Sequence, residues 1–339
     1  MSAKTILITG GSGYLGGHLV KESLARGYHV RAVVRSETSY KSILKNFPEY
    51  ASKLSYVVVP DITIVEAYKD AFEGVVGVLH SASPFNLEPE DNEKDLLQPA
   101  IKGCVSMLDA SLRYGKQVKR VVVTSSHASV VDIPKGKRPG YVYDEKDWNP
   151  VSYEEAADPS TPGVVAYCAS KALAERAIWK WTEEHKDAPF DVATITPPWI
   201  FGPYATDLKS TKHLSESVKL LYGMIGAKEI LPFDFGGFAD VREVAAAHLL
   251  ALEVPEAGGQ RFWIGQTFQY QTAVDAARRL LPELKTRLPE GKPGWREDIY
   301  GVDGTKAVRV LGLKYRTLDD TVKDTYAQLL RAEEIEGSA

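Results

Sequence analysis

The sequence predicts an α/β protein built on a doubly wound parallel sheet, with a smaller and mostly helical C-terminal lobe. Three observations support this prediction. Short apolar runs alternate with longer helical patterns through the first two hundred residues, which is typical of β-α-β units. A glycine-rich turn follows the first apolar run directly. After Pro203 the alternation stops, and helical stretches are mixed with loops rich in glycine, proline and aromatic residues.

Seven short apolar runs are predicted to form the strands of this sheet. They cover residues 5–9, 29–34, 54–59, 77–80, 120–125, 191–196 and, at an edge of the sheet, 260–265. Helices are expected to begin near Tyr14, Glu37, Val65, Asn92 and Val165. Two further helices are expected over 210–222 and 241–253.

The composition is that of an ordinary globular chain, with 44% hydrophobic and 25% charged residues among 339. A net charge of −4 leaves no basic excess to neutralise phosphates, which argues against a nucleic-acid partner. The first apolar run breaks at Gly10 and no later run reaches eighteen residues, so neither a signal segment nor a membrane helix is predicted. Only Cys104 and Cys168 are present, which favours a reducing, cytoplasmic location.

The turn after the first predicted strand carries three glycines spaced three residues apart. Glycines allow a tight turn and let the backbone approach a pyrophosphate, which meets the positive end of the following helix. A flexible turn without a ligand is the alternative, but the flanking strand and helix favour a dinucleotide site. The spacing G-x-x-G-x-x-G resembles the fingerprint of the extended short-chain dehydrogenase/reductases, which have a Rossmann sheet. The expected cofactor-binding residues here are Gly10, Ser12, Gly13, Tyr14, Leu15 and Gly16.

The choice of nicotinamide cofactor depends on the end of the second predicted strand. An acidic side chain there would accept hydrogen bonds from a ribose 2′-hydroxyl and repel a 2′-phosphate. Arg35 and Ser36 occupy this point instead. A charge-assisted hydrogen bond from a guanidinium to a phosphate contributes roughly 1.5–3 kcal/mol. The sequence therefore predicts NADP(H) bound by Arg35 and Ser36, with a merely solvated arginine as the alternative.

A tyrosine and a lysine lie four residues apart on a predicted helix, so Tyr167 and Lys171 share one face of it. This spacing alone has little weight, because 17 tyrosines would supply such a match by chance. The position of the pair decides. It lies downstream of the fifth strand, which runs into Thr124 and Ser126 at the edge where sites of doubly wound sheets open.

These residues suit the reduction of a carbonyl group. A carbonyl that accepts a hydride also needs a proton, and a phenol with a pKa near 10 is poorly matched to neutral pH. The Lys171 ammonium is expected to lower the pKa of Tyr167 and to bind the nicotinamide ribose. Ser126 is expected to donate a hydrogen bond to the carbonyl oxygen, where negative charge develops. Ser126, Tyr167 and Lys171 are thus the predicted catalytic residues.

The resemblance extends along most of the chain. The chain is similar to fungal NADPH-dependent ketone and methylglyoxal reductases, within the group that includes plant dihydroflavonol reductases. The segments that carry it are 59–62, 80–85, 124–126, 167–171, 201–203, 236–242 and 291–294.

The resemblance implies further contacts to the cofactor. Asp61 and Ile62 would flank the adenine, and the backbone around Pro197 and Ile200 would hold the nicotinamide. The other implied cofactor residues are Ser81, Ala82, Ser83, Thr124 and Ser217. Asp61 could instead cap the next helix, and Ser217 could be an ordinary serine on an exposed helix.

The resemblance also implies a mostly apolar substrate pocket for hydrophobic ketones or aldehydes, lined by Phe85, His127, Val131 and Trp199. Relatives often carry an aromatic residue at 127 and 131, so this pocket is expected to be roomier or more polar. His127 is expected to line the pocket or to be hydrogen-bonded rather than to act as an acid. Residues 1–203, joined by 236–266, are assigned to a dinucleotide-binding domain. Residues 204–235 and 267–339 are assigned to a substrate-binding lobe.

Three questions remain open at this point. A nucleotide-sugar epimerase or dehydratase shares the glycine loop and the Tyr/Lys pair, although Arg35, and His127 with Ala128 after Ser126, count against it. A regulator that senses NADPH without turnover would usually lack the tyrosine or the lysine. The apolar helix pattern from Asn92 to Tyr114 is compatible with a homodimer and with a monomer. Asp240 and Arg242 are expected to be structural, with Asp240 capping a helix and Arg242 pairing locally.

Overall fold

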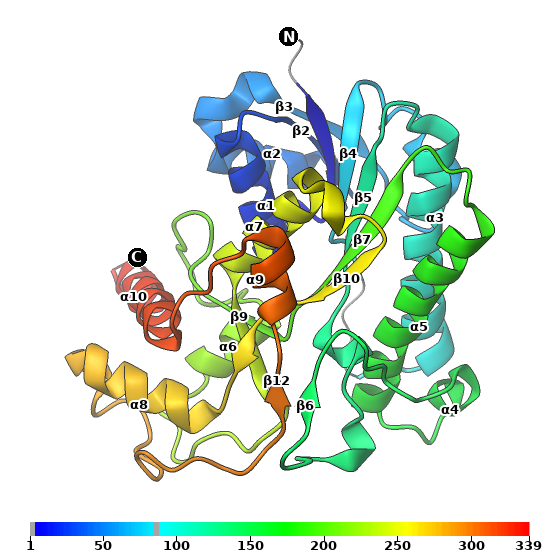
Figure 1. The fold of residues 1–339 in the computed structure, drawn as a ribbon. Helices are drawn as coiled ribbons and strands as arrows, with labels where there is room; N and C mark the ends of the chain where they lie inside the picture. Colours follow the sequence, from blue (N-terminus) through cyan, green and yellow to red (C-terminus); the bar gives the residue numbers. More distant parts are fainter. Residues whose placement is uncertain (1–3, 84–87, 339) are drawn as a thin grey trace.

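The computed structural model describes residues 4–83 and 88–338 and is built around a seven-stranded parallel sheet (Figure 1). From edge to edge the strands follow the order β10-β7-β5-β4-β1-β2-β3. The direction in which successive strands are added to the sheet therefore reverses between β1 and β4. The strands are β1 Thr5–Thr9, β2 His29–Val34, β3 Leu54–Val58, β4 Val75–His80, β5 Arg120–Thr124, β7 Asp191–Thr196 and β10 Gln260–Trp263. Thr9 pairs with His80, and Thr124 pairs with Ile195. The residues that end these strands therefore lie along one edge of the sheet.

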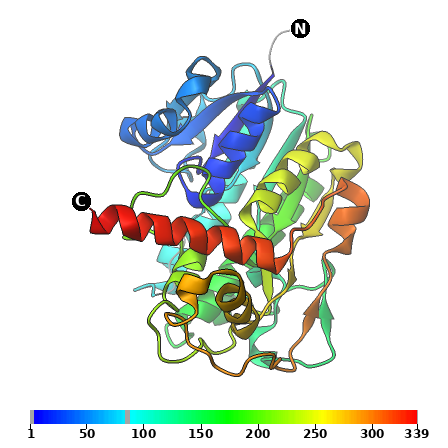
Figure 2. The ribbon, with the colours of Figure 1, turned by 90° about the vertical axis from the view of Figure 1, so that its left-hand side faces the viewer.

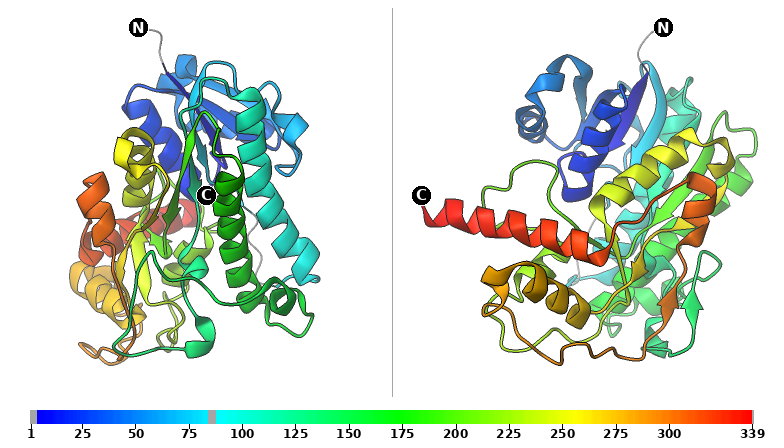
Figure 3. Two further views of the ribbon diagram at one scale, coloured as in Figure 1. Left: turned by 45° about the vertical axis from the view of Figure 1, so that its right-hand side comes forward. Right: turned by 60° about the vertical axis from the view of Figure 1, so that its left-hand side comes forward.

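Helices cover both faces of this sheet, as the edge-on view of Figure 3 shows. On one face pack α1 Tyr14–Ala25, α2 Glu37–Asn46 and α7 Val241–Glu253, which bury apolar residues such as Leu19, Ile43 and Val244. On the other face α3 Gln98–Tyr114 and α5 Gly163–Glu184 lie side by side and bury Met107 and Ile178. Two apolar layers thus enclose the sheet, as expected for a doubly wound fold.

The smaller lobe has its own hydrophobic core, which includes Phe201, Phe268 and Tyr326. Its helices are α6 Glu216–Tyr222, α8 Tyr270–Leu280 and α10 Leu318–Gly337. A three-stranded sheet has the order β11 Gln266–Thr267, β9 Gly237–Asp240, β8 Trp199–Phe201, and β6 Val142–Tyr143 pairs with β12 Gly301–Val302. The remaining helices are α4 Tyr153–Ala157 and α9 Thr305–Leu311. Although α9 lies in the predicted lobe, its Ala307 and Leu311 join the core of the large sheet.

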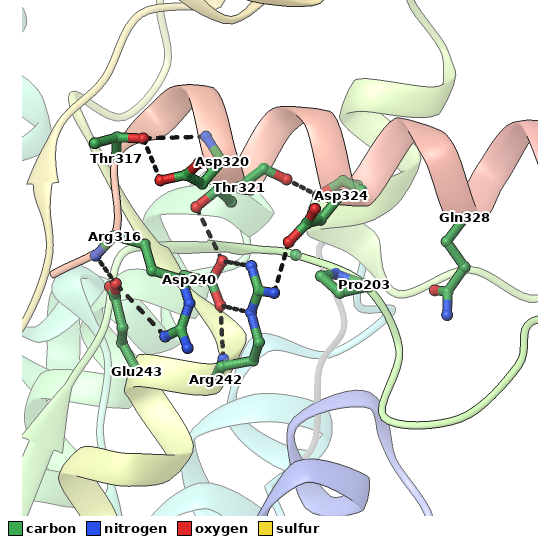
Figure 4. Close-up of polar contacts among 12 residues, drawn as sticks. Pro203, Asp240, Arg242, Glu243, Arg316, Thr317, Asp320, Thr321, Asp324 and Gln328 are labelled. Atoms are coloured by element: carbon green, nitrogen blue, oxygen red, sulfur yellow. Dashed lines mark hydrogen bonds and ion pairs between the residues drawn. The ribbon is translucent and has the colours of Figure 1, made fainter.

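The C-terminal helix α10 crosses the lobe and is held by a buried acid (Figures 2 and 4). Asp240 is 0% exposed and caps α7 by accepting a hydrogen bond from the Arg242 backbone N–H. It also accepts from the Arg242 guanidinium and from the Thr321 hydroxyl at 2.9 Å, while Arg242 pairs with Asp324. The expected helix cap at Asp240 and the local pairing of Arg242 are both confirmed.

Two expected helices differ in the structure. The helix expected over 210–222 begins only at Glu216, because Ser210 and Thr211 hold the preceding loop by donating to Glu336 on α10. The helix expected from Val65 is a single 3-10 turn, Val65–Tyr68. Further 3-10 turns cover Pro48–Lys53, His127–Ser129, Ile133–Lys135, Pro255–Ala257 and Pro282–Leu284, and a π-helical turn, Glu93–Leu97, leads into α3.

The apolar surface that suggested a homodimer is largely used inside the chain. Leu96, Leu97, Ala100 and Leu108 are each at most 4% exposed. Leu112, near the end of α3, is 38% exposed. Among the described residues, no helix combines the length and apolar character needed to cross a bilayer.

Candidate active site

The glycine loop and the predicted catalytic residues lie at the carboxyl ends of β1 and β5 and on one face of α5, whereas Arg35 and Asp61 follow β2 and β3. Parallel sheets of this topology bind their ligands at this edge, at the point between β1 and β4 where the order of the strands reverses. Phe85 lies outside the described residues.

The glycine loop is shaped for a close approach. Gly10 has a φ of +72°, and its carbonyl accepts a hydrogen bond from the Gly13 N–H at 2.9 Å. A Cβ on Gly16 would lie 1.9 Å from the Gly10 carbonyl oxygen, so only glycine fits at this position. Ser12 is exposed, whereas Tyr14 is turned inward and donates to the Gly202 carbonyl at 2.7 Å.

The start of α1 suits an anionic ligand. Gly13 caps the helix without a side-chain hydrogen bond, and the first turn, which includes Leu15, carries no acidic residue. The N–H groups at this end and the positive end of the helix dipole are therefore not neutralised by the helix itself. A cavity of about 270 Å³ adjoins the loop and is lined by residues 11–14 and by the segments 204–206 and 213–215. These features fit the pyrophosphate of a dinucleotide.

Arg35 and Ser36 follow β2 and are both exposed. The Arg35 guanidinium makes no ion pair with any of the described residues, so it is available to an anion. Ser36 caps α2 by accepting a hydrogen bond from the Ser39 N–H at 3.4 Å. A positive side chain beside a helix N-terminus fits the 2′-phosphate of NADP(H).

The ends of β1 and β4 are tied together by Thr9. Its hydroxyl accepts from the backbone N–H groups of Ser81 at 3.1 Å and Ala82 at 3.0 Å. Its proton then points to His80 Nδ1, 2.9 Å away, and the Ser81 hydroxyl donates to the Thr9 carbonyl. Burial lowers the pKa of His80 to about 4, and the charge of Lys171 contributes in the same direction. A neutral His80 thus fixes the backbone beside the glycine loop.

Ser126, Tyr167 and Lys171 are brought together by β5 and α5. The Ser126 hydroxyl hydrogen-bonds the Tyr167 side chain. Lys171 Nζ lies 5.2 Å from the centre of the Tyr167 ring and donates to the Ser83 hydroxyl at 2.5 Å. The three groups form one cluster, with the ammonium directed to the loop after β4.

The ionisation of this cluster corrects one expectation. Burial raises the pKa of Tyr167 above its ordinary value, and the hydrogen bond with Ser126 offsets this only in part. In this structure, in which the ammonium is bonded to Ser83, the pKa of Tyr167 is therefore raised and not lowered as expected. Burial also lowers the pKa of Lys171, to about 8. At neutral pH the phenol keeps its proton and most of the lysine is charged.

His127 and Val131 are 2% and 3% exposed and pack in a cluster with Trp263 and Tyr300. His127 Nδ1 accepts from the Trp263 indole at 3.0 Å, which leaves Nε2 as the protonated nitrogen, 3.3 Å from the Tyr300 hydroxyl. Burial lowers the pKa of His127 to about 3, so the ring is neutral and is not a general acid at neutral pH. Its hydrogen-bonded state is the alternative that the sequence favoured over acid catalysis.

Trp199 is half-buried on β8 and donates from its indole to Asp234 at 3.2 Å. Asp234 also accepts from the Tyr270 hydroxyl at 2.6 Å. Beside it lies a largely apolar cavity of about 360 Å³, whose walls include Phe233, Phe235, Tyr270 and Trp295.

The other residues implied to touch the cofactor occupy the same side of the sheet. The Pro197 carbonyl accepts from the His127 N–H at 2.8 Å, and the Ile200 N–H donates to the Ser217 hydroxyl at 3.3 Å. The Thr124 hydroxyl bonds to His248 at 2.7 Å.

Asp61 is exposed and accepts from the N–H and hydroxyl of Thr63. It therefore closes its own turn and does not cap the 3-10 turn that begins at Val65. Ile62 packs against α3 at Gly103.

Sequence reasoning missed the buried Glu175, which lies four residues after Lys171 on α5 and is 1% exposed. The continued four-residue spacing from Tyr167 was the available signal. It also missed His80, His248 and Asp234, which hold Thr9, Thr124 and Trp199. In the described part of the chain, no group of three or more metal-ligating side chains occurs.

The chain matches a known protein family. Residues 6–265 match the model of the NAD dependent epimerase/dehydratase family. The chain belongs to this family. Membership of the extended short-chain dehydrogenase/reductases, inferred from the motifs, is confirmed.

Individual relatives match nearly the whole chain. The NADPH-dependent methylglyoxal reductase of Saccharomyces cerevisiae is 35% identical over 97% of this chain and 99% of the relative. A ketoreductase of Aspergillus niger is 38% identical over 97% of this chain and 98% of the relative. The crystal structure of the yeast methylglyoxal/isovaleraldehyde reductase with NADPH has a TM-score of 0.91 at 34% identity, covering 98% of this chain and 99% of that one.

Proposed function

We propose that this protein is an NADPH-dependent carbonyl reductase that converts ketones or aldehydes to alcohols. The observation that carries the proposal is the cluster of Ser126, Tyr167 and Lys171 beside the glycine loop, at the carboxyl edge of the sheet. A phenol, an ammonium and a hydroxyl at one point are the groups that hydride reduction of a carbonyl requires.

Different groups of residues would bind the pyrophosphate, the 2′-phosphate and the ribose of NADPH. The start of α1 and the loop from Gly10 to Gly16 would bind the pyrophosphate, and Arg35 with Ser36 would bind the 2′-phosphate. Lys171 would exchange its bond to Ser83 for the ribose hydroxyls. Residues 1–203 and 236–266 would thus form the cofactor domain, and 204–235 with 267–339 the substrate lobe.

In this reaction bound NADPH supplies a hydride to the carbonyl carbon. Tyr167 donates its proton to the carbonyl oxygen, which becomes the alcohol hydroxyl. Its raised pKa keeps that proton in place at neutral pH until the oxygen gains negative charge. The Ser126 hydroxyl donates a hydrogen bond to the same oxygen, and the Lys171 ammonium stabilises the phenolate that remains.

The substrate would be a small molecule with a largely apolar body. Trp199 on β8 and the neighbouring lobe cavity offer an aromatic wall, and the cavity is also lined by the charged side chains of Lys137, Asp234, Lys292 and Glu297. Phe85, His127 and Val131 remain predicted pocket residues, of which His127 and Val131 are 2% and 3% exposed.

A nucleotide-sugar epimerase of the same family is the second candidate, since the family itself is described by that activity. Arg35 stands where a tightly held NAD would favour an acidic side chain. The relatives that match nearly the whole chain are named as reductases. We also propose a cytoplasmic location, which the free thiols of Cys104 and Cys168 support.

The proposal is tested by following NADPH absorbance with a panel of ketones, aldehydes and diketones, repeated with NADH and with Tyr167→Phe. We expect turnover with NADPH, a strong preference over NADH, and a loss of about 100-fold or more in kcat for the variant. Arg35→Asp serves as the control for cofactor choice and should reverse the preference. Turnover of a nucleotide sugar without net NADPH consumption would favour the epimerase.

A further inference from the structure

A buried carboxylate links the helix that carries Tyr167 and Lys171 to the loop that carries Ser126. Glu175 follows Lys171 by one helical turn on α5 and is 1% exposed. Resting on the proposed function, we propose that Glu175 is a positioning residue. It fixes the distance between the Ser126 hydroxyl and the Tyr167 phenol without touching the substrate.

One oxygen of Glu175 holds the Ser126 loop from both sides. Oε2 accepts from the Ser125 hydroxyl at 2.7 Å and lies 2.7 Å from the Ser129 hydroxyl. The Ser129 oxygen is also 2.7 Å from the carbonyl oxygen of Ser126, so its single proton is shared between the two acceptors. Residues immediately before and three after Ser126 are therefore anchored to α5.

The other oxygen of Glu175 holds the sheet. Oε1 accepts from the Thr194 hydroxyl on β7 at 2.7 Å and from Arg261 Nε on β10 at 2.7 Å. The same carboxylate therefore fixes the helix, the catalytic loop and two strands relative to one another.

Arg261 holds the Glu175 carboxylate in its charged form. Its side chain is 10% exposed and lies 3.6 Å from the centre of the Trp148 ring, and it also donates to the carbonyls of Glu145 and Asp147. The nearby guanidinium and the hydroxyl donors hold the pKa of Glu175 below its ordinary value despite its burial. The carboxylate therefore keeps its charge and its hydrogen bonds across the pH range of catalysis.

Contacts on either side of Ser126 restrict the loop further. Thr124 is bonded to His248, and the His127 N–H donates to the Pro197 carbonyl. A proton donor and its helper must be held within a fraction of an ångström, and a misplacement of about 1 Å can lower the rate by about 100-fold. Loss of the Glu175 contact to the loop should therefore act on kcat.

The test compares two hydroxyl deletions that remove equal bonds from the same carboxylate. Ser125→Ala removes the 2.7 Å bond from the catalytic loop, and Thr194→Val removes the 2.7 Å bond from β7. Each should lower Tm by about 2–4 °C. Ser125→Ala should lower kcat by about tenfold with an unchanged KM for NADPH, whereas Thr194→Val should keep kcat within about twofold.

A pH profile adds a readout that stability alone would not move. The hydrogen bond with Ser126 lowers the pKa of Tyr167. A looser loop should therefore move the alkaline limb set by Tyr167, which lies above the limb set by Lys171 near pH 8, to higher pH in Ser125→Ala but not in Thr194→Val. Glu175→Gln should show the same shift with a larger loss of kcat if it folds, and Ser125→Ala carries the test if it does not.

The outcomes separate the two proposals. Equal kcat values for Ser125→Ala and Thr194→Val, whether both high or both low, would overturn the positioning role while the wild-type protein remains a reductase. A wild-type protein that oxidises no NADPH with any carbonyl would instead overturn the proposed function, and this inference with it.

Discussion

Two glutamates of this protein are equally buried and yet differ in their ionisation. Glu175 on α5 and Glu243 on α7 are each 1% exposed. The pKa of Glu175 is lowered, whereas that of Glu243 is raised to about 7. Burial is therefore not what distinguishes them.

The difference lies in the donors around each carboxylate. Both oxygens of Glu175 accept short hydrogen bonds, and Arg261 supplies a charge beside them. Oε1 of Glu243 accepts from the Arg316 N–H and lies 4.0 Å from Arg316 Nη1 (Figure 4), but Oε2 has no partner among the described residues. The nearby charge of Asp240 raises its pKa further.

Two equally exposed glutamates can therefore have different charge states, and the hydrogen-bond donors around each carboxylate decide which one it has. A fully paired carboxylate keeps its charge and can hold a catalytic loop still. A half-paired carboxylate takes up a proton near neutral pH, and the contact between α7 and the segment before α10 then depends on pH.

The largest expected effect is that of Glu175→Ala. It removes the carboxylate acceptor from Ser125, Thr194 and Arg261 and leaves a buried guanidinium without its ion-pair partner. We expect a loss of about 3–5 kcal/mol in the free energy of unfolding, measured by urea denaturation. Glu243→Ala, the matched control at the same exposure, should cost clearly less because one of its oxygens is already unpaired. Equal losses would remove the distinction drawn between the two sites.

Glu243→Gln is expected to change the pH dependence of stability. The folded pKa of about 7 lies above the ordinary value of 4.5, so the folded state binds the proton more tightly. This site therefore makes the protein less stable as pH rises between these values, with no further change above them. The variant should match the wild-type protein near pH 5 and exceed it near pH 8 by on the order of 3 kcal/mol. Parallel stability curves for the two proteins would show that Glu243 does not titrate in this range.

Thr321→Val should have the smallest effect. It removes one 2.9 Å hydrogen bond from Asp240, which keeps its bonds from Arg242. We expect a loss of about 1 kcal/mol by the same urea measurement. Thr325→Val, whose hydroxyl donates to a carbonyl within α10, is the control and should cost no more. A loss as large as that of Glu175→Ala would mean that a carboxylate with several hydrogen-bond donors cannot tolerate the absence of one of them.

The strands of the large sheet could be predicted because each is a short apolar run, and the central ones are buried on both faces. β1, β2 and β7 have the bounds expected from the sequence, and the others differ by one or two residues. The strands of the lobe could not, since β6 and β12 are two residues long and pair across a large sequence separation. Local patterns carry no record of such pairings.

Part of the chemistry of the site could be predicted from the sequence. Motif order located Ser126, Tyr167 and Lys171, but not the direction of the Tyr167 pKa, which depends on burial and on where the ammonium points. The role of Glu175 was hidden because its partners Ser125, Thr194 and Arg261 lie 50, 19 and 86 residues away.

The proposed reaction is tested most directly by its stoichiometry. Enzyme, NADPH and an apolar ketone would be mixed, and the alcohol formed would be counted against the NADPH oxidised. The account predicts one alcohol for each NADPH consumed, with the hydride of the cofactor found on the carbinol carbon. Product that forms while NADPH stays unchanged, or NADPH that is oxidised without alcohol, would contradict it.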